Sequence, residues 1–351
     1  MPHLTDLSKL KTSEILQILK KSHEIFESPA DFKNLHKDKI LATLFYEPST
    51  RTQLSFQTAA IKLGGSFVGF SDAESSSHSK GESLTDTIKI IGEYADIIAM
   101  RHPCEGAANL AATVSKIPII NAGDGANLHP TQTLCDLFTM QKHKGTLEGL
   151  TIGIAGDLLY SRTAHSLVKE LARFKNNKFI LISTEKLRLP QSLKDKIVSA
   201  GLQFSEIGSL QEAIDKLDVL YMTRIQKERF DSQQDYLTQK GKFILDKAVL
   251  TNAKQDLSIL HPLPRIDEIS PEIDQDLRAH YFLQAKYGVF VRMALIDYLL
   301  KGNGHSAATL SEGENYTACQ NEKCISKFER NLEKTALKGD CKLCDKKCLT
   351  I

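Results

Sequence analysis

The chain has 351 residues, of which 41% are hydrophobic, and its 45 Lys and Arg nearly balance its 43 Asp and Glu. This length allows two ordinary domains with a small appendage, and the hydrophobic fraction can fill their cores without disulfide bonds. The balanced charge gives no general reason to expect a nucleic-acid or membrane partner, and no apolar run reaches signal-peptide or membrane-span length. We therefore expect a cytoplasmic globular protein.

The predicted elements alternate between short apolar strands and longer helices. Apolar residues at helical spacing predict a first helix over 12–26. Apolar runs then predict strands at 40–46, 95–100, 117–122, 150–156, 178–183, 218–223 and 257–263. Such alternation is typical of α/β proteins, so we expect two doubly wound parallel-sheet domains.

The order of these elements suggests the domain boundaries. We expect residues 1–130 to form one domain, completed by a C-terminal helix at 287–302, and residues 131–286 to form the other. Residues 303–316 are small and polar, which indicates a linker, and residues 317–351 form a cysteine-rich tail. In parallel α/β sheets, sites lie beyond the carboxyl ends of strands and between domains, so functional residues should follow the strands.

The segment FYEPSTRT is a candidate anion site. Pro48 ends the strand 40–46, and Ser49, Thr50, Arg51 and Thr52 open a helix. Hydroxyls, unpaired N–H groups and a guanidinium at a helix start all favour phosphate. An ordinary serine cap beside a surface arginine remains the alternative.

Other segments of the first half carry polar groups in similar places. Ser76 and Lys80 lie in the loop SSSHSKGES, which is either a ligand-contacting loop or a solvated linker, and Arg101 follows the strand 95–100. His129 and Gln132 flank the start of a helix after the Gly-rich segment 121–127. A histidine at the positive end of a helix is biased toward its neutral form, so His129 could donate a hydrogen bond to a carbonyl or simply cap the helix.

The second half repeats the pattern of cations after strands. Arg162 opens a helix after strand 150–156, and Arg224 and Gln226 follow strand 218–223. The glycines at 153 and 156 lack the spacing of a dinucleotide loop, so we do not expect a nicotinamide cofactor. Together, arginines after separate strands indicate a cleft for more than one negative charge: Arg51, Arg101, Arg162 and Arg224.

Most of the cysteines lie in the tail. Four residues separate Cys319 from Cys324, and two residues separate Cys341 from Cys344. This pattern is typical of a structural zinc site, with one ion per chain. Reduced surface thiols or an iron site are the alternatives, and Cys348 could replace Cys344 as a ligand. The small positive surplus of the tail does not favour nucleic-acid binding.

Over residues 4–301, the motifs taken together resemble the catalytic chain of aspartate carbamoyltransferases: FYEPSTRT, SKGES, MRHP, NAGDG, HPTQTL, YSRTAHSL, MTRIQKERF and HPLPR. The sister ornithine enzymes carry a cysteine where this chain has Leu263, and they lack the R-x-Q of Arg224 to Gln226. The resemblance implies transfer of a carbamoyl group from carbamoyl phosphate to L-aspartate, in pyrimidine synthesis, without a catalytic cofactor. A carbamoyltransferase for another amino acid and a catalytically silent scaffold subunit are the alternatives.

The same resemblance implies roles for the candidate residues. The phosphate would be bound by Ser49, Thr50, Arg51 and Thr52. The carbonyl oxygen would be polarised by Arg101 and His129, with Thr52. The carbamoyl nitrogen would be bound by Gln132 and by the main-chain carbonyls of Pro262 and Leu263. Arg162, Arg224 and Gln226 would bind the aspartate carboxylates. In the neighbouring subunit's site, Ser76 would reach carbamoyl phosphate and Lys80 would reach both substrates. This implies a homotrimer with shared active sites and leaves open whether trimers pair.

The tail also resembles a known module. Its C-x4-C-I-S and C-K-x-C segments are similar to the zinc domain of the separate regulatory chain of some aspartate carbamoyltransferases, with a shorter spacer between the cysteine pairs. The nucleotide-binding domain of that regulatory chain has no counterpart here. The resemblance therefore implies a zinc module joined to a catalytic chain, without the nucleotide sensor.

Overall fold

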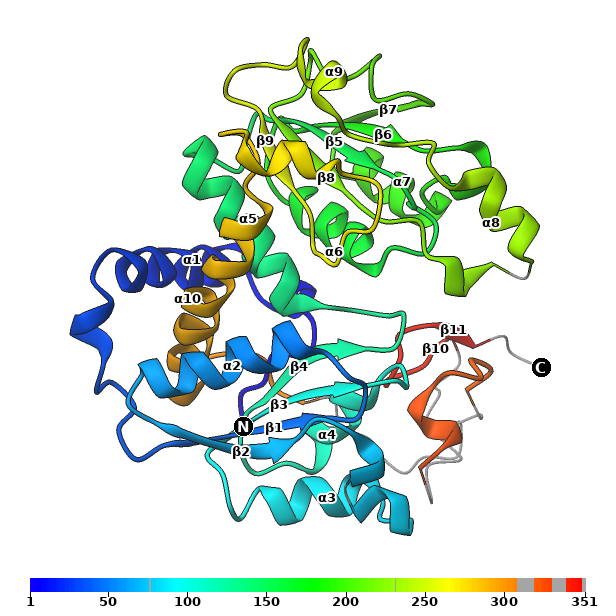
Figure 1. Cartoon of the computed structure of the whole chain (residues 1–351). Coiled ribbons are helices and arrows are strands. Elements are labelled where there is room, and N and C mark those ends of the chain that lie inside the picture. The colour runs from blue at the N-terminus through cyan, green and yellow to red at the C-terminus, as the bar shows by residue number, and fades with distance from the viewer. Residues whose placement is uncertain (76, 231, 308–318, 330–338, 349–351) are drawn as a thin grey trace. The chain divides into compact units, whose positions relative to one another are not determined.

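The structure is a computed structural model that describes residues 1–75, 77–230, 232–307, 319–329 and 339–348. The chain forms two compact units (Figure 1). The first comprises Met1–Thr131 and Gly288–Ile351, and the second comprises Gln132–Tyr287. Each unit has its own parallel sheet with helices packed on it, so the predicted α/β class is confirmed.

The sheet of the first unit has the strand order β2-β1-β3-β4, with all neighbours parallel. The strands are β1 (Ile40–Phe45), β2 (Ser66–Phe70), β3 (Ile97–His102) and β4 (Ile119–Asp124). The predicted strands at 40–46, 95–100 and 117–122 correspond to β1, β3 and β4. Strand β2 was not predicted, because it is an edge strand with largely exposed side chains and an internal Gly69. A Cβ at Gly69 would lie 2.0 Å from the Thr43 carbonyl oxygen, so only glycine lets β2 lie this close to β1.

Helices cover both faces of this sheet. They are α1 (Thr12–Glu27), α2 (Thr50–Lys62), α3 (Leu84–Ile91), α4 (Ala107–Val114) and α10 (Tyr281–Leu300), of which the part from Gly288 belongs to this unit. Short 3₁₀ turns are Leu7–Lys9, Pro29–Phe32, Ala73–Ser75, Ser77–Lys80 and Ile325–Lys327. Helices α1, α2 and α10 pack together: the Phe26 and Phe290 rings meet edge to face at 5.2 Å, and the Arg292 guanidinium lies over Phe56.

The segment after α10 is hydrogen-bonded to the N-terminal segment of the chain. His3 and His305 exchange two backbone hydrogen bonds of 2.8 and 3.1 Å, and His305 Nε2 accepts the N–H of Thr5. Residues 303–307 therefore pair with the N-terminus of the chain, which the small polar composition of 303–316 did not reveal. The rest of that predicted linker lies outside the described residues.

The second unit has a sheet of order β7-β6-β5-β8-β9, again parallel throughout. The strands are β5 (Thr151–Ala155), β6 (Lys178–Ile182), β7 (Gln203–Ile207), β8 (Val219–Met222) and β9 (Ser258–Leu260). The helices are α5 (Pro130–Lys144), α6 (Arg162–Leu171), α7 (Gln191–Ser199), α8 (Gln233–Gln239) and α9 (Lys247–Leu250), with 3₁₀ turns at Glu185–Leu187, Lys227–Arg229 and Pro271–Gln275. Strand β7, a half-exposed edge strand, was not predicted.

Within the described ranges, none of the helices combines the length and apolar character that a bilayer crossing requires.

Candidate active site and cysteine cluster

The predicted phosphate segment lies where β1 passes into α2. Ser49 is the N-cap residue of α2, and its hydroxyl makes no capping bond to the helix. Its carbonyl accepts the N–H of Gln53 at 3.0 Å, so the amides of the preceding first-turn residues have no partner within the helix. Thr50 and Arg51 are exposed, as a ligand site at this helix start requires.

Arg101 lies beside this segment. It is the penultimate residue of β3 rather than a residue after the strand, and it pairs in register with Phe45. Its Nη2 lies 3.1 Å from Glu47 Oε2. Burial lowers the pKa of Arg101, Glu47 opposes this shift, and the nearby charge of Arg51 adds to it. Two guanidinium groups that repel each other in this way form a strongly positive site.

His129 follows the next strand of the same sheet. The turn between β4 and α5 is organised by the buried carboxylate of Asp124, which accepts N–H groups of Gly106 at 2.8 Å and Leu128 at 3.1 Å. Burial raises the pKa of Asp124, and its hydrogen bonds oppose this shift. The turn leaves His129 buried directly before α5. The first sheet thus brings Arg51, Arg101 and His129 to the carboxyl ends of three adjacent strands.

The loop before α3 is not continuous coil. Residues Ser77–Lys80 form a 3₁₀ turn, and Lys80 is exposed on it. Helix α3 begins at Leu84, and Ser83 Oγ caps it by accepting the N–H of Asp86 at 3.1 Å. Ser76 lies outside the described residues.

In the second unit, the loops after β5 and β8 are joined by hydrogen bonds. Arg162 opens α6, as predicted, and Gln226 Nε2 donates to Asp157 Oδ2 at 3.3 Å. Burial raises the pKa of Asp157, and its hydrogen bonds to Gln226 and to backbone amides oppose this shift. Arg224 makes a bidentate ion pair with Glu228, and this pair raises the pKa of Arg224. The structure therefore places Arg224 and Gln226 at the end of β8, beside the loop that leads to Arg162.

The residues after β9 are held by a buried histidine. His261 Nδ1 accepts the N–H of Leu263 at 2.8 Å, so its Nε2 donates to Glu268 Oε1 at 2.7 Å. Leu263 has a φ of 53°, and the following bond to Pro264 is cis. His261, held by Glu268, thereby restrains the peptide between Pro262 and Leu263.

A buried carboxylate in α5 supports both this segment and Gln132. Asp136 accepts hydrogen bonds from Gln132 Nε2 at 2.7 Å, Gln284 Nε2 at 2.6 Å and Tyr221 OH at 3.0 Å. Gln284 Oε1 in turn accepts the N–H of His261 at 3.0 Å. Sequence reasoning missed Asp136, although its spacing of four residues from Gln132 on one helix was a usable signal.

Removal of this carboxylate should destabilise the protein. Asp136→Ala leaves the Tyr221 hydroxyl and two amide groups without their acceptor, at a cost of about 3 kcal/mol in unfolding free energy. Asp136→Asn keeps one oxygen and should cost less. Urea unfolding followed by circular dichroism measures the difference. Asp195→Ala is a matched control, because Asp195 accepts from Gln191 at the same spacing on an exposed helix face. Equal stability of the Asp136→Ala and Asp195→Ala proteins would contradict the assigned role.

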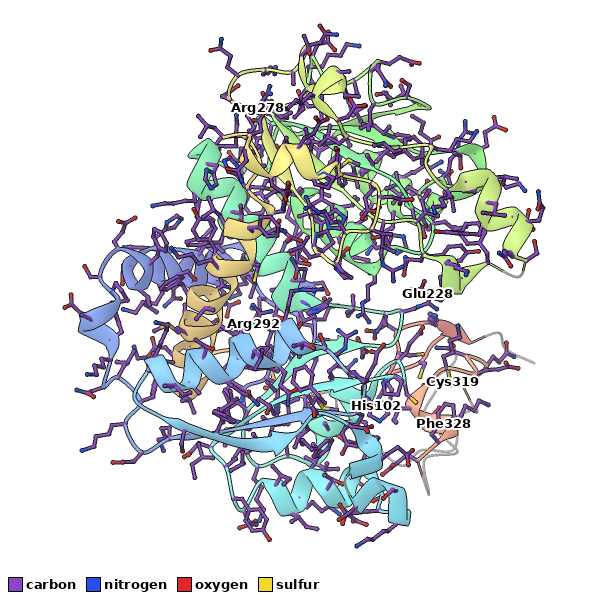
Figure 2. The ribbon with its side chains drawn as sticks, in the orientation of Figure 1. His102, Glu228, Arg278, Arg292, Cys319 and Phe328 are labelled. Carbon is purple, nitrogen blue, oxygen red and sulfur yellow. The ribbon has the colours of Figure 1, made fainter. Side chains whose placement is uncertain are left out.

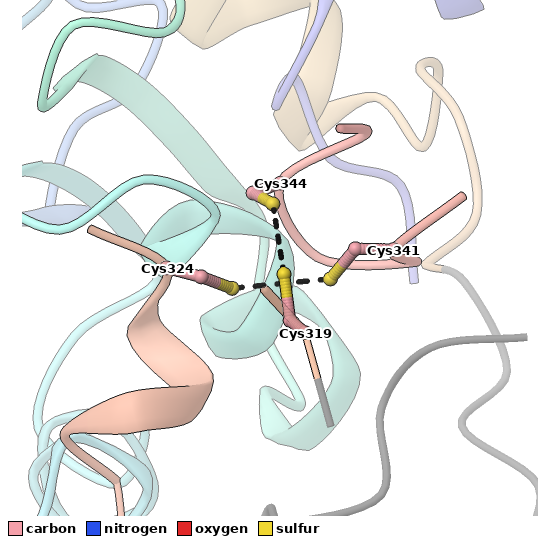
Figure 3. Close-up of side chains that lie close together, drawn as sticks. All are labelled: Cys319, Cys324, Cys341 and Cys344. Carbon is pink, nitrogen blue, oxygen red and sulfur yellow. Dashed lines mark hydrogen bonds between the residues drawn. The ribbon is translucent and has the colours of Figure 1, made fainter. Parts of the chain in front are cut away.

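The four predicted cysteine ligands converge in the tail. The sulfur atoms of Cys319, Cys324, Cys341 and Cys344 all lie within 4.8 Å of one another, and all four residues are buried (Figure 3). The Sγ atoms of Cys319 and Cys344 are 3.7 Å apart, and those of Cys324 and Cys341 are 3.8 Å apart. Ligands at the usual Zn–S distance of about 2.3 Å in a tetrahedron are about 3.8 Å from one another. The cluster therefore fits a tetrahedral metal ion; the side chain of Cys348 is outside the described part.

This cluster is anchored on the first unit through Glu105. The N–H of Glu105 donates to the Lys323 carbonyl, and its own carbonyl accepts the N–H of Ile325, both at 2.9 Å. Its buried carboxylate accepts from Asn321 Nδ2 at 2.8 Å and pairs with Lys346 at 2.6 Å. Figure 2 shows Cys319 beside the end of β3, where His102 lies, in agreement with these contacts.

The start of α4 lies directly against the tail. A Cβ at Gly106, whose φ is 82°, would lie 2.6 Å from the Leu343 carbonyl oxygen. Asn109 Nδ2 donates to the same oxygen at 2.7 Å. The cysteines, Ile325 and Leu343 belong to one hydrophobic cluster with residues of β1, β3, α3 and α4. The tail is thus part of the core of the first unit.

Comparison with known proteins identifies the family. Residues 2–142 match the family described as "Aspartate/ornithine carbamoyltransferase, carbamoyl-P binding domain", and residues 148–299 match the corresponding "Asp/Orn binding domain". The aspartate carbamoyltransferase catalytic subunit of Clostridium perfringens is 54% identical over 299 residues, which are 85% of this chain and 97% of that protein. The Clostridium kluyveri protein is 53% identical over 298 residues, with the same shares covered.

Solved structures agree with these sequence matches. The catalytic subunit of M. jannaschii aspartate transcarbamoylase has a TM-score of 0.82 and 46% identity, covering 86% of this chain and 99% of that one. The Trypanosoma cruzi enzyme in complex with carbamoyl phosphate has a TM-score of 0.80 and 38% identity, covering 85% of this chain and 95% of that one. The two matched family domains end at residue 299, so the cysteine tail lies beyond them.

The chain belongs to the aspartate/ornithine carbamoyltransferase family. Its activity is that of the aspartate enzymes: it transfers the carbamoyl group of carbamoyl phosphate to L-aspartate. The activity expected from the sequence motifs is confirmed.

Proposed function

We propose that the residues at the edge of the first sheet bind carbamoyl phosphate. The observation that supports this most directly is the convergence of Arg51, Arg101 and His129 at the ends of adjacent strands. The open amides at the start of α2, with Ser49, Thr50, Arg51 and Thr52, bind the phosphate. Arg101, His129 and Thr52 bind the carbonyl oxygen. A Trypanosoma cruzi relative solved with carbamoyl phosphate supports this ligand.

The residues of the second unit bind L-aspartate. Arg162 and Arg224 bind the two carboxylates, and Gln226 supports Arg224. The Arg224–Glu228 pair supports this role, because a substrate carboxylate offers the guanidinium the same two acceptors as Glu228. Gln132 and the carbonyls of Pro262 and Leu263 bind the carbamoyl nitrogen. A related Trypanosoma cruzi structure contains carbamoyl phosphate and aspartate together.

In this arrangement the chain supplies position and charge rather than a nucleophile. Carbamoyl phosphate is already activated, and the α-amine of aspartate attacks its carbonyl carbon. The new C–N bond forms as the bond between the carbonyl carbon and the phosphate oxygen breaks, and the departing phosphate takes the amine proton. Arg101 and His129 stabilise the negative charge on the carbonyl oxygen, and Arg51 stabilises the phosphate dianion.

A comparison of variants tests these roles. Arg51→Ala should lower kcat/KM by about 100- to 1000-fold, because a charged contact to the leaving group is lost. Phosphate release with L-aspartate is the measurement, with L-ornithine as the alternative acceptor. Lys62→Ala is the control, since Lys62 lies at the exposed far end of the same helix. Turnover of Arg51→Ala close to the wild-type value would contradict the phosphate role, and turnover with ornithine alone would contradict the aspartate role.

We also propose that Ser76 and Lys80 act in the site of a neighbouring subunit, in a homotrimer with shared active sites. The exposed turn that carries Lys80 supports this proposal. A loop that reaches a neighbour's site must project from its own unit.

Hybrid trimers test the sharing of sites. We expect Arg51→Ala subunits and Lys80→Ala subunits to be nearly inactive when each is assembled alone. When they are unfolded, mixed equally and reassembled, about one quarter of wild-type activity should return. In a random mixture, about one quarter of the interfaces join a subunit with intact Arg51 to a neighbour with intact Lys80. Mixing either variant with itself is the control. A mixture that stays as inactive as its components would contradict shared sites.

We further propose that the cysteine cluster binds one structural Zn²⁺ ion per chain in the cytoplasm, where thiols remain reduced. The sulfur geometry and the burial of all four thiols support zinc rather than surface thiols. Zinc would bind the four thiolates and join Cys319 and Cys324 to Cys341 and Cys344. It would supply folding free energy to a segment too small to form its own core.

Metal analysis of the purified protein tests this site. We expect about one zinc per chain in the wild type and little in Cys324→Ser, because a lost thiolate opens the tetrahedral site. Cys104→Ser is the matched control, since Cys104 lies outside the cluster. Iron in place of zinc, or equal zinc in both variants, would contradict the proposal.

A further inference from the structure

One carboxylate of the tail caps a helix of the first unit. Glu329 Oε2 accepts the N–H of Leu84 at 3.0 Å, and Glu329 Oε1 accepts the N–H of Thr85 at 3.0 Å. Oε1 also accepts the Thr85 hydroxyl at 2.8 Å. These contacts join residues about 245 positions apart in the sequence, so they depend entirely on the docked tail.

The carboxylate satisfies donors at the start of the capped helix. The first amides of an α-helix have no partner within the helix, and its positive end favours an anion. In α3, Ser83 accepts the N–H of Asp86 and Glu329 accepts those of Leu84 and Thr85. The start of α3 is therefore completed by a side chain from the C-terminal tail rather than by the segment that precedes it.

A short, hydrogen-bonded backbone segment connects the cysteine cluster to Glu329. Cys324 is followed by the 3₁₀ turn Ile325–Lys327, and the N–H of Glu329 donates to the Ile325 carbonyl at 3.0 Å. Ile325 is itself buried and bonded to the backbone of Glu105. The position of the Glu329 carboxylate is thus set by the cluster and by its anchor.

On the other side, α3 directly follows the turn that carries Lys80. Glu82 lies between them, and its carboxylate accepts the Thr87 hydroxyl at 2.6 Å, while its N–H donates to the Ser77 carbonyl at 3.3 Å. Glu82 therefore ties the first residue of the turn to the first helical turn of α3. We expect a change at the start of α3 to shift this turn.

The charge of Glu329 also acts on Tyr46, which directly follows β1. Burial raises the pKa of Tyr46 to about 12, and the carboxylates of Glu82 and Glu329 add to this shift. Tyr46 directly precedes Glu47, the partner of Arg101. The tail carboxylate thus contacts the helix that follows the Lys80 turn and acts electrostatically on a residue next to Glu47.

We propose that Glu329 is a positioning residue for the reaction, which holds the Lys80 turn in place by capping α3. This proposal rests on the role proposed above for Lys80. It assigns the tail a part in catalysis that is separate from metal binding. Removal of the carboxylate should keep the fold of the first unit and the cysteine ligands, but it leaves uncapped the start of the helix to which Glu82 ties the turn.

Steady-state kinetics of the full-length enzyme test the proposal. Glu329→Ala should lower kcat/KM for carbamoyl phosphate by about tenfold, mainly through a higher KM, because Lys80 is less often in position. Glu329→Gln keeps one acceptor oxygen and should show a smaller loss. Glu322→Ala is the matched control, since Glu322 is an exposed carboxylate of the same tail and should leave the kinetics unchanged. Thermal unfolding of each variant checks that the fold is kept.

A double-variant cycle separates positioning from a general structural effect. If Glu329 acts through Lys80, Glu329→Ala should have little further effect in the Lys80→Ala enzyme. Equal fold losses in both backgrounds would overturn the proposal, as would unchanged kinetics of Glu329→Ala. Wild-type activity of Lys80→Ala would instead contradict the role of Lys80, which distinguishes failure of that assignment from failure of this one.

Discussion

The parallel pairing of strands is the constraint on which the candidate site depends. Because β1, β3 and β4 run in the same direction, the segments that follow them meet at one edge of the first sheet. The hydrogen bond from the Tyr46 N–H to the Arg101 carbonyl extends the pairing of β1 with β3 by one residue, which sets Arg101 beside the start of α2. The second sheet places the loops after β5, β8 and β9 together in the same way.

Buried carboxylates hold these loops in position. Asp124 organises the turn before His129, and Glu105 anchors the tail. Asp136 supports Gln132 directly and the segment after β9 through Gln284. A buried carboxylate is stable only when several donors satisfy it, so each one fixes the geometry of several groups at once. Glu47 and Glu228 pair with Arg101 and Arg224 and hold these guanidinium groups in position.

The tail is integrated into the first unit rather than attached to it. Its cysteines and Leu343 share a hydrophobic cluster with β1, β3, α3 and α4, and Gly106 allows close approach of its backbone. Ligation of a metal by these cysteines therefore links the free energy of metal binding to the packing of the domain that carries Arg51 and Arg101. The proposed zinc ion and the proposed role of Glu329 would both act through these contacts between the tail and the first unit.

The sequence by itself determined the α/β class, the activity and the four cysteines that cluster. It also predicted the strands β1, β3, β4, β5, β6, β8 and β9. These features could be predicted because apolar periodicity, helix starts and motif spacing are local signals. The sequence did not reveal the edge strands β2 and β7, whose half-exposed residues carry no continuous apolar run. Only the tertiary structure decided where the tail docks, that Glu329 caps α3, and that Asp136 supports residues from α5, β8 and α10. Apart from the Gln132–Asp136 bond within α5, these contacts join residues far apart in the chain, and no local pattern encodes such pairings.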